Sequence, residues 1–198
     1  MNSLRSVLEL AREYNRLVNI AEIARRYFAM NAFDGVLTMI GVLMGNWIAG
    51  VDDARIVIST GLTTSVAMGI SGLWGAYLTE AAERQRDLVE LSRQTLTDLN
   101  DTVIGRASRA AVVVVALVDG LSPFLAAVLV LSPFFAADLF PSISWAYYTS
   151  LGIALSTLFG LGLFLGHISR GNMLVYGVKT VVAGVLSIVI SSLLGASG

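Results

Sequence analysis

Apolar residues are gathered into five long runs along the chain. Each run contains about 20 or more mainly apolar residues, which is the length a helix needs to cross the hydrocarbon core of a bilayer. The runs cover residues 29–50, 56–79, 107–137, 143–166 and 173–195. This pattern predicts an all-α membrane protein with five transmembrane helices.

The third run is too long for one simple helix, and it contains two prolines, Pro123 and Pro133. Proline lacks the backbone N–H that an α-helix uses for its hydrogen bonds, and its ring disturbs the preceding turn. We therefore expect this transmembrane helix to be kinked near Ser122 and to end in a turn within residues 131–138.

Two polar segments complete the predicted organisation. In residues 1–28, apolar residues recur at helical spacing among charged ones. This indicates an amphipathic helix that lies on the inner membrane surface or packs on the protein's own cytosolic face. Residues 80–106 are rich in charge and predict a short cytosolic helical segment. They separate the first two spans, residues 29–79, from the last three, residues 107–198.

Composition agrees with a membrane protein. Of the 198 residues, 56% are hydrophobic and only 14% are charged, whereas a soluble domain carries about a quarter charged residues. A net charge of −1 gives no electrostatic basis for binding nucleic acid. Cysteine is absent, so a metal would have to be held by oxygen, by methionine sulfur or by the single histidine, His167. We expect that histidine to serve as a helix-end partner.

The basic residues predict the orientation in the membrane. They cluster before the first run and between the second and third, and Arg170 lies between the fourth and fifth. Arg55, between the first and second runs, is the one basic residue in a connection on the opposite side. Because Lys and Arg mark the cytosolic side, we expect a cytosolic amino terminus and an external carboxyl terminus, with the protein in the cell membrane if it is prokaryotic.

Two carboxylates lie inside predicted spans, Asp34 in "AFDGVLTM" and Asp119 in "LVDGLSPF". A charged side chain in hydrocarbon costs at least about 2.5 kcal/mol, so each needs a compensating partner. A divalent cation would supply one, and its binding would expel protons, which is the minimal requirement for metal/proton exchange. A structural interpretation stays open, in which each Asp caps or hydrogen-bonds a broken helix beside its glycine.

The second span offers further candidates for an ion path. Thr64 and Met68 lie on one helical stripe that continues through Ser71 and Gly75. A thioether on the path would favour a borderline transition metal such as Fe²⁺ over Mg²⁺. The alternative for Met68 is plain packing, which is the usual role of methionine in membrane helices.

An acidic stripe follows the second span. Glu80, Glu83, Asp87 and Glu90 have spacings of three, four and three, so they share one face of a helix. Like charges at this spacing repel, and a salt bridge from Glu80 to Arg84 relieves only part of the repulsion. We interpret the stripe either as a cytosolic site that collects divalent cations or as an ordinary solvated face.

The segments "FDGVLTMIGVLMG" and "GISGLWGAYLTEAAER" resemble the first two helices of the vacuolar iron transporters. The resemblance implies a transporter, without enzymatic activity or a tightly bound cofactor, that moves Fe²⁺ or Mn²⁺ out of the cytosol in exchange for protons. It also implies that Asp34 is the acid of the transport path and that the acidic stripe collects the metal.

The chain also departs from that family. Aligned on Tyr77 and Leu78, it has Gly72 where the family has a methionine and Thr64 where the family has a glutamate. Asp119 replaces a residue that is usually glycine. The hypothesis is a divergent prokaryotic branch in which Asp119 compensates for the missing glutamate.

Small residues predict close helix packing. They recur at intervals of about four in the spans, as in Thr38, Gly41 and Gly45. Such stripes serve packing within one chain or a seam between two chains. Together with the family resemblance, they lead us to expect a homodimer with the ion path at or near its two-fold axis.

Two other functions are alternatives to transport. A membrane structural or assembly protein would carry no metal flux. A metal-dependent lipid head-group transferase would need several aspartates at short fixed spacing near an Ala-Arg pair, a pattern that the sequence after Asp34 does not contain.

Overall fold

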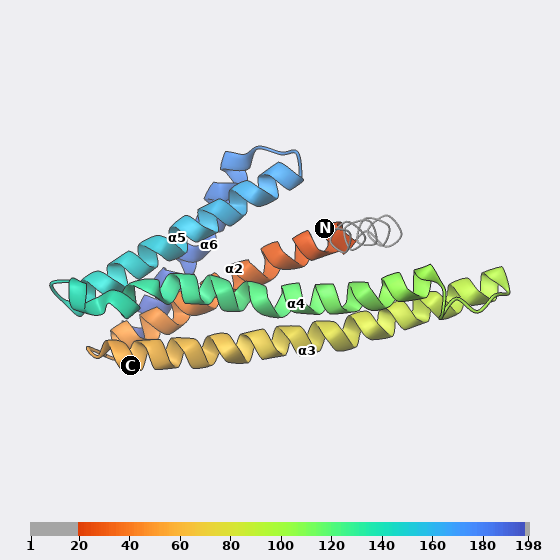
Figure 1. The fold of residues 1–198 in the computed structure, drawn as a ribbon. Helices are drawn as coiled ribbons and strands as arrows, with labels where there is room; N and C mark the ends of the chain where they lie inside the picture. Colours follow the sequence, from red (N-terminus) through yellow and green to blue (C-terminus); the bar gives the residue numbers. More distant parts are fainter. Residues whose placement is uncertain (1–19, 197–198) are drawn as a thin grey trace, which may run out of the picture. The chain divides into compact units, whose positions relative to one another are not determined.

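The computed structural model describes residues 20–196, and all of its regular elements are helices (Figure 1). Five helical segments are long and apolar enough to cross a membrane, and the chain is a multi-pass integral membrane protein. The predicted fold class is confirmed. The elements are α2 (Ile20–Ile48), α3 (Ala54–Thr95), α4 (Val103–Leu131), the 3-10 helix η1 (Ser132–Leu139), α5 (Ile143–Ile168) and α6 (Met173–Ala196).

Most of the predicted amino-terminal amphipathic helix, residues 1–19, lies outside the described residues. Residues 20–28 form the first turns of α2 and continue into the first span without a break.

Helix α3 is much longer than a bilayer requires. Its 42 residues extend over about 63 Å at 1.5 Å per residue, about twice the thickness of the hydrocarbon core. The first part of the charged segment is therefore the continuation of the second span, and the prediction that it is helical is confirmed for residues 80–95, whereas residues 96–102 form a non-helical connection. The helix ends before Leu96, which has the left-handed φ of 53° that usually favours glycine at helix ends.

The helical break in the third span comes at its second proline. Helix α4 contains Pro123 without an interruption, whereas it ends two residues before Pro133. The 3-10 helix η1 follows and contains a non-helical residue, Ala136, with φ −115° and ψ 26°. The turn expected within residues 131–138 is thus confirmed.

The chain folds as two compact units. The first unit contains residues 20–28 and 70–121, and the second contains residues 29–69 and 122–196. Each unit is built from parts of several helices, so a single helix such as α3 contributes to both.

The core of the second unit is formed by one face of α2 against the last turns of α4, η1 and α5. The buried residues Val36, Met39, Ile40 and Leu43 follow the i, i+3, i+4, i+7 spacing of a helix face. At one end of this core, the Tyr147 ring packs edge-on against Trp47 and against Phe134, each with ring centroids 4.9 Å apart. The Tyr147 hydroxyl donates a hydrogen bond of 3.0 Å to the carbonyl of Val51.

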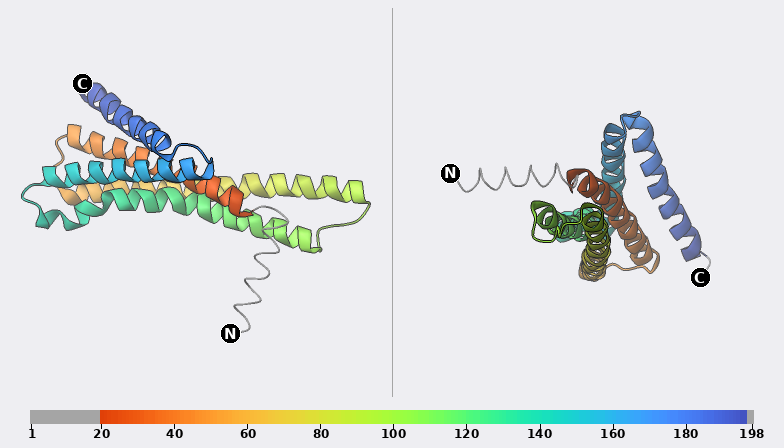
Figure 2. Two further views of the ribbon diagram at one scale, coloured as in Figure 1. Left: turned by 90° about the horizontal axis from the view of Figure 1, so that it is seen from above. Right: turned by 90° about the vertical axis from the view of Figure 1, so that its right-hand side faces the viewer.

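Helices α5 and α6 form a closely packed pair in the second unit (Figure 2). The contact depends on Gly162, because a Cβ there would lie 2.6 Å from the Gly177 Cα and would also meet the Thr180 side chain. Thr180 Oγ1 donates a hydrogen bond of 2.8 Å across the pair to the Leu158 carbonyl. Small residues at this contact allow the two backbones to approach.

We predict that Gly162→Ala lowers the stability of the protein by about 1–3 kcal/mol, because the added methyl group has no room against the α6 backbone. Gly160→Ala is the matched control. Nothing among the described residues lies within 4 Å of a Cβ at Gly160, and alanine favours the helix by up to about 1 kcal/mol. Thermal unfolding in detergent measures both, and equal midpoints for the two variants would contradict the proposed packing.

Candidate functional site

Asp34 is exposed on the surface of a single chain, although it lies in a membrane-spanning helix. The next residue, Gly35, is buried, and a Cβ at that position would lie 2.6 Å from the Pro123 Cα. The glycine of this Asp-Gly pair therefore allows α2 to approach α4 within the second unit. The helix continues through both residues, so Asp34 does not cap a helix end.

The exposed face of α2 that carries Asp34 contains small and polar residues. Thr38 and Gly45 are also exposed, and Gly41 is half-buried. A Cβ on Gly41 or Gly45 would meet no other side chain or neighbouring helix within 4 Å among the described residues. Among residues 20–196, no other helix packs against Gly41 or Gly45 of this stripe.

Thr64 and Met68 lie on α3 in the same unit, and both are half-buried. The Thr64 hydroxyl donates a hydrogen bond of 2.8 Å to the carbonyl of Thr60, one turn earlier. Met68 packs against the hydrophobic core of the unit. These contacts account for both side chains without a bound ion.

Asp119 belongs to the first unit and is only 7% exposed. It lies on α4 opposite Gly72 of α3, where a Cβ on the glycine would lie 3.0 Å from the carboxylate Oδ2 and 2.9 Å from the Asp119 backbone oxygen. The two helices come close at this point because residue 72 has no side chain. Asp119 is therefore surrounded by protein.

Glu80 is the second buried carboxylate of the first unit, with 5% exposure. Its Oε2 lies 3.3 Å from the Arg84 Nε, which confirms the predicted i, i+4 salt bridge. Its Oε1 accepts a hydrogen bond of 3.4 Å from the Tyr27 hydroxyl. Tyr27 also interacts electrostatically with Asp119, the other buried acid of the unit.

The contact between Tyr27 and Glu80 is not predictable from the sequence. The two residues are 53 positions apart along the chain, and no spacing rule connects residues at that separation. Arg26, the preceding residue on α2, places a positive charge near the Tyr27 ring. Its guanidinium carbon lies 5.8 Å from the ring centroid.

The acidic stripe shares one face of α3, as its spacing predicts, but its members differ in environment. Glu80 is buried, whereas Glu83, Asp87 and Glu90 are exposed. The Gln94 side chain donates a hydrogen bond of 3.0 Å to Glu90. Within residues 20–196, no three Asp, Glu or His side chains are arranged to hold a metal ion. A metal site built from three such side chains is therefore not present within the described part of one chain.

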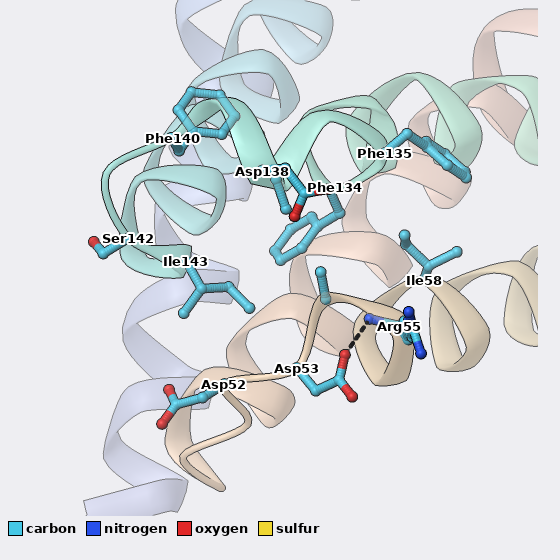
Figure 3. A pocket seen from close by; sticks show the side chains of 12 residues that line it. Asp52, Asp53, Arg55, Ile58, Phe134, Phe135, Asp138, Phe140, Ser142 and Ile143 are labelled. Atoms are coloured by element: carbon cyan, nitrogen blue, oxygen red, sulfur yellow. Dashed lines mark hydrogen bonds between the residues drawn. The ribbon is translucent and has the colours of Figure 1, made fainter.

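A cavity of about 570 Å³ opens in the second unit, where the α2–α3 connection meets η1 and the start of α5 (Figure 3). Its lining includes three carboxylates, from Asp52 and Asp53 of the connection and from Asp138 of η1, together with Arg55. Asp53 Oδ1 accepts a hydrogen bond of 2.8 Å from the Arg55 backbone N–H and so stabilises the first turn of α3. Figure 3 shows Asp52 and Asp138 on different walls of the cavity.

No model of a known protein family matches the chain. The chain is 31% identical over 189 residues to the uncharacterized protein MJ0645 of Methanocaldococcus jannaschii. The matched region covers 93% of this chain and 95% of the archaeal protein. The similarity therefore extends over nearly the full length of both proteins.

We predict that Arg84→Ala lowers stability by about 2 kcal/mol, because it leaves the buried Glu80 carboxylate without its cationic partner. Arg86→Ala is the matched control, since Arg86 is exposed on the same helix. We expect the control to stay within about 0.5 kcal/mol of the wild type. Thermal unfolding in detergent compares the two, and a similar loss in both variants would show that the ion pair does not stabilise the first unit.

Proposed function

We propose that this protein, which belongs to the same family as the archaeal protein MJ0645, exports a divalent transition metal, Fe²⁺ or Mn²⁺, from the cytosol in exchange for protons. The observation that carries the proposal is the position of Asp34, a carboxylate exposed on the membrane-spanning part of α2. The likeness of its helix, and of the helix that follows, to the vacuolar iron transporters supports the same function.

A carboxylate at such a position needs a partner. Facing lipid, its charge would cost at least about 2.5 kcal/mol. The structural interpretation, in which Asp34 serves its own helix, has little support because the helix runs through it without a break. A cation in a water-accessible path is the partner that we propose, with oxygen ligands of the kind that divalent metals accept.

A second copy of the chain would provide the walls of this path. The stripe of α2 combines Asp34 with the small residues Thr38, Gly41 and Gly45, and the described residues leave open space around both glycines. Small residues at such spacing allow two helices to pack closely in lipid. Two-fold pairing along this stripe would bring two copies of Asp34 together and would supply the ligands that a single chain lacks.

The other acids have supporting roles in the proposal. The exposed Glu83, Asp87 and Glu90 of the acidic stripe attract divalent cations on the cytosolic side. In this proposal the buried Glu80 is the member of the stripe nearest the span, and Asp119 supplies a further carboxylate within the span. The carboxylates of the cavity around Asp52 attract released cations at the opposite surface.

The first test is flux into proteoliposomes. We expect the wild-type protein to drive Fe²⁺ or Mn²⁺ uptake when a pH gradient is imposed, with counterflow of protons. Asp34→Asn and Asp119→Asn remove the charge at nearly constant volume and should each lower the rate at least tenfold. Glu22→Gln, which changes an exposed acid in the first turn of α2, should keep the wild-type rate.

The outcomes separate the alternatives. An absence of flux for both metals in the wild type would favour a structural or assembly protein. Normal flux in Asp119→Asn alone would remove that residue from the path and leave the role of Asp34 intact.

The second test concerns assembly. We predict a dimer in native mass spectra recorded from mild detergent, and we predict that Gly41→Leu converts it to a monomer by filling the exposed stripe of α2. Gly152→Leu is the matched control, because Gly152 of α5 is exposed and, like Gly41, has open space around a Cβ among the described residues. A monomeric wild type with full transport activity would exclude a path between two chains.

A further inference from the structure

A groove between α3 and α4 in the first unit is placed to bind lipid. Its volume is about 310 Å³, and its lining includes Tyr77, Arg84 and Leu88 of α3 and Arg109, Val112 and Val113 of α4. Among the described residues that line it, two are cationic and none is acidic. The groove therefore attracts anions.

The position of the groove along α3 matches a membrane surface. The hydrocarbon core needs about 20 residues of helix or more, and the apolar run on α3 covers residues 56–79, so the core ends between Trp74 and residue 79. Trp74 and Tyr77 are 61% and 44% exposed, and such aromatic residues are enriched at the level of the lipid head groups. Arg84 lies further along the helix, on the aqueous side of this level.

The two arginines are fixed in position and retain hydrogen-bonding capacity. The Arg84 Nε–H donates a hydrogen bond of 3.3 Å to the Glu80 carboxylate, and the Arg109 Nη1–H donates one of 3.0 Å to the Asn100 carbonyl. A guanidinium has five N–H donors in a planar array that matches a phosphate. Each arginine therefore keeps donors that can reach an anionic group in the groove.

The side of the groove toward the membrane is apolar. The Val112 side chain is buried, with 6% exposure, and forms part of the floor of the groove. Val113 is 51% exposed and, with Tyr77, lies at the edge of the groove. A surface with guanidinium groups and, on their membrane side, apolar side chains is complementary to a phospholipid, whose phosphate and acyl chain have the same order.

We propose that this groove binds one anionic phospholipid, with its phosphate between Arg84 and Arg109 and an acyl chain along Val113 and Tyr77. The site lies in the first unit and includes neither Asp34 nor Asp119. It needs only the insertion of the protein in a membrane, and it does not depend on metal transport. Bound lipid would fill the space between α3 and α4 at the membrane surface and would fix the ends of both helices there.

The first measurement is lipid binding by native mass spectrometry. Detergent-purified protein is titrated with phosphatidylglycerol and with phosphatidylcholine of the same acyl chains. We expect phosphatidylglycerol to bind at least about fivefold more tightly, and Arg109→Gln to remove about fivefold of this preference. Arg86→Gln, an exposed arginine of α3 outside the groove, should change it less than twofold. Equal affinities for the two lipids, or equal effects of the two substitutions, would overturn the proposal.

The second measurement identifies the occupant in the cell membrane. A photo-reactive amino acid at Val113 should capture anionic phospholipid in excess of its share of the membrane. The same group at Val114, which is exposed but outside the groove, should capture lipids in proportion to their abundance. Capture of residues 1–19 or of a second copy at Val113, or no excess of anionic lipid there, would overturn the proposal.

Discussion

The requirement that a carboxylate in or near hydrocarbon must have a partner shapes much of this molecule. Asp119 meets it by burial between α3 and α4 in the first unit. Glu80 meets it through Arg84 and the Tyr27 hydroxyl. Asp34 is exposed on a spanning helix and has no such protein environment among residues 20–196. The three acids thus have three different environments, and the second copy of the chain proposed above would complete the one around Asp34.

Glycine determines where helices come close enough to enclose polar groups. Gly35 lies against the Pro123 backbone in the second unit, and Gly72 lies against Asp119 in the first. Lipid supplies no hydrophobic force to press helices together, so close backbone contact is one of the main sources of association. A polar side chain next to such a contact is held by protein on at least one side. In both places, an acid of a span lies beside a glycine at which two helices come close.

The sequence predicted the elements well because their signals are local. The spans follow from the length of apolar runs, and the helical acidic segment and the Glu80–Arg84 pair follow from a period of 3.6 residues. The environments of the acids could not be predicted, because burial depends on which distant helix covers a given face. The contact of Tyr27 with Glu80 and the closeness of Asp119 to Gly72 are of this kind. The position of the helical break was ambiguous for a related reason: Pro123 is accommodated within α4, and α4 ends two residues before Pro133.

The turn after α3 has a practical consequence. Leu96 is 92% exposed and adopts a left-handed backbone conformation, so its side chain adds nothing to a core and its backbone is strained. From Tyr77 to Thr95 the helix extends about 27 Å at 1.5 Å per residue. A fluorescent protein or an epitope inserted at Leu96 would stand clear of the lipid head groups and would disturb little that is folded. The same position would then report, by antibody access in intact cells, which side of the membrane this end of the protein occupies.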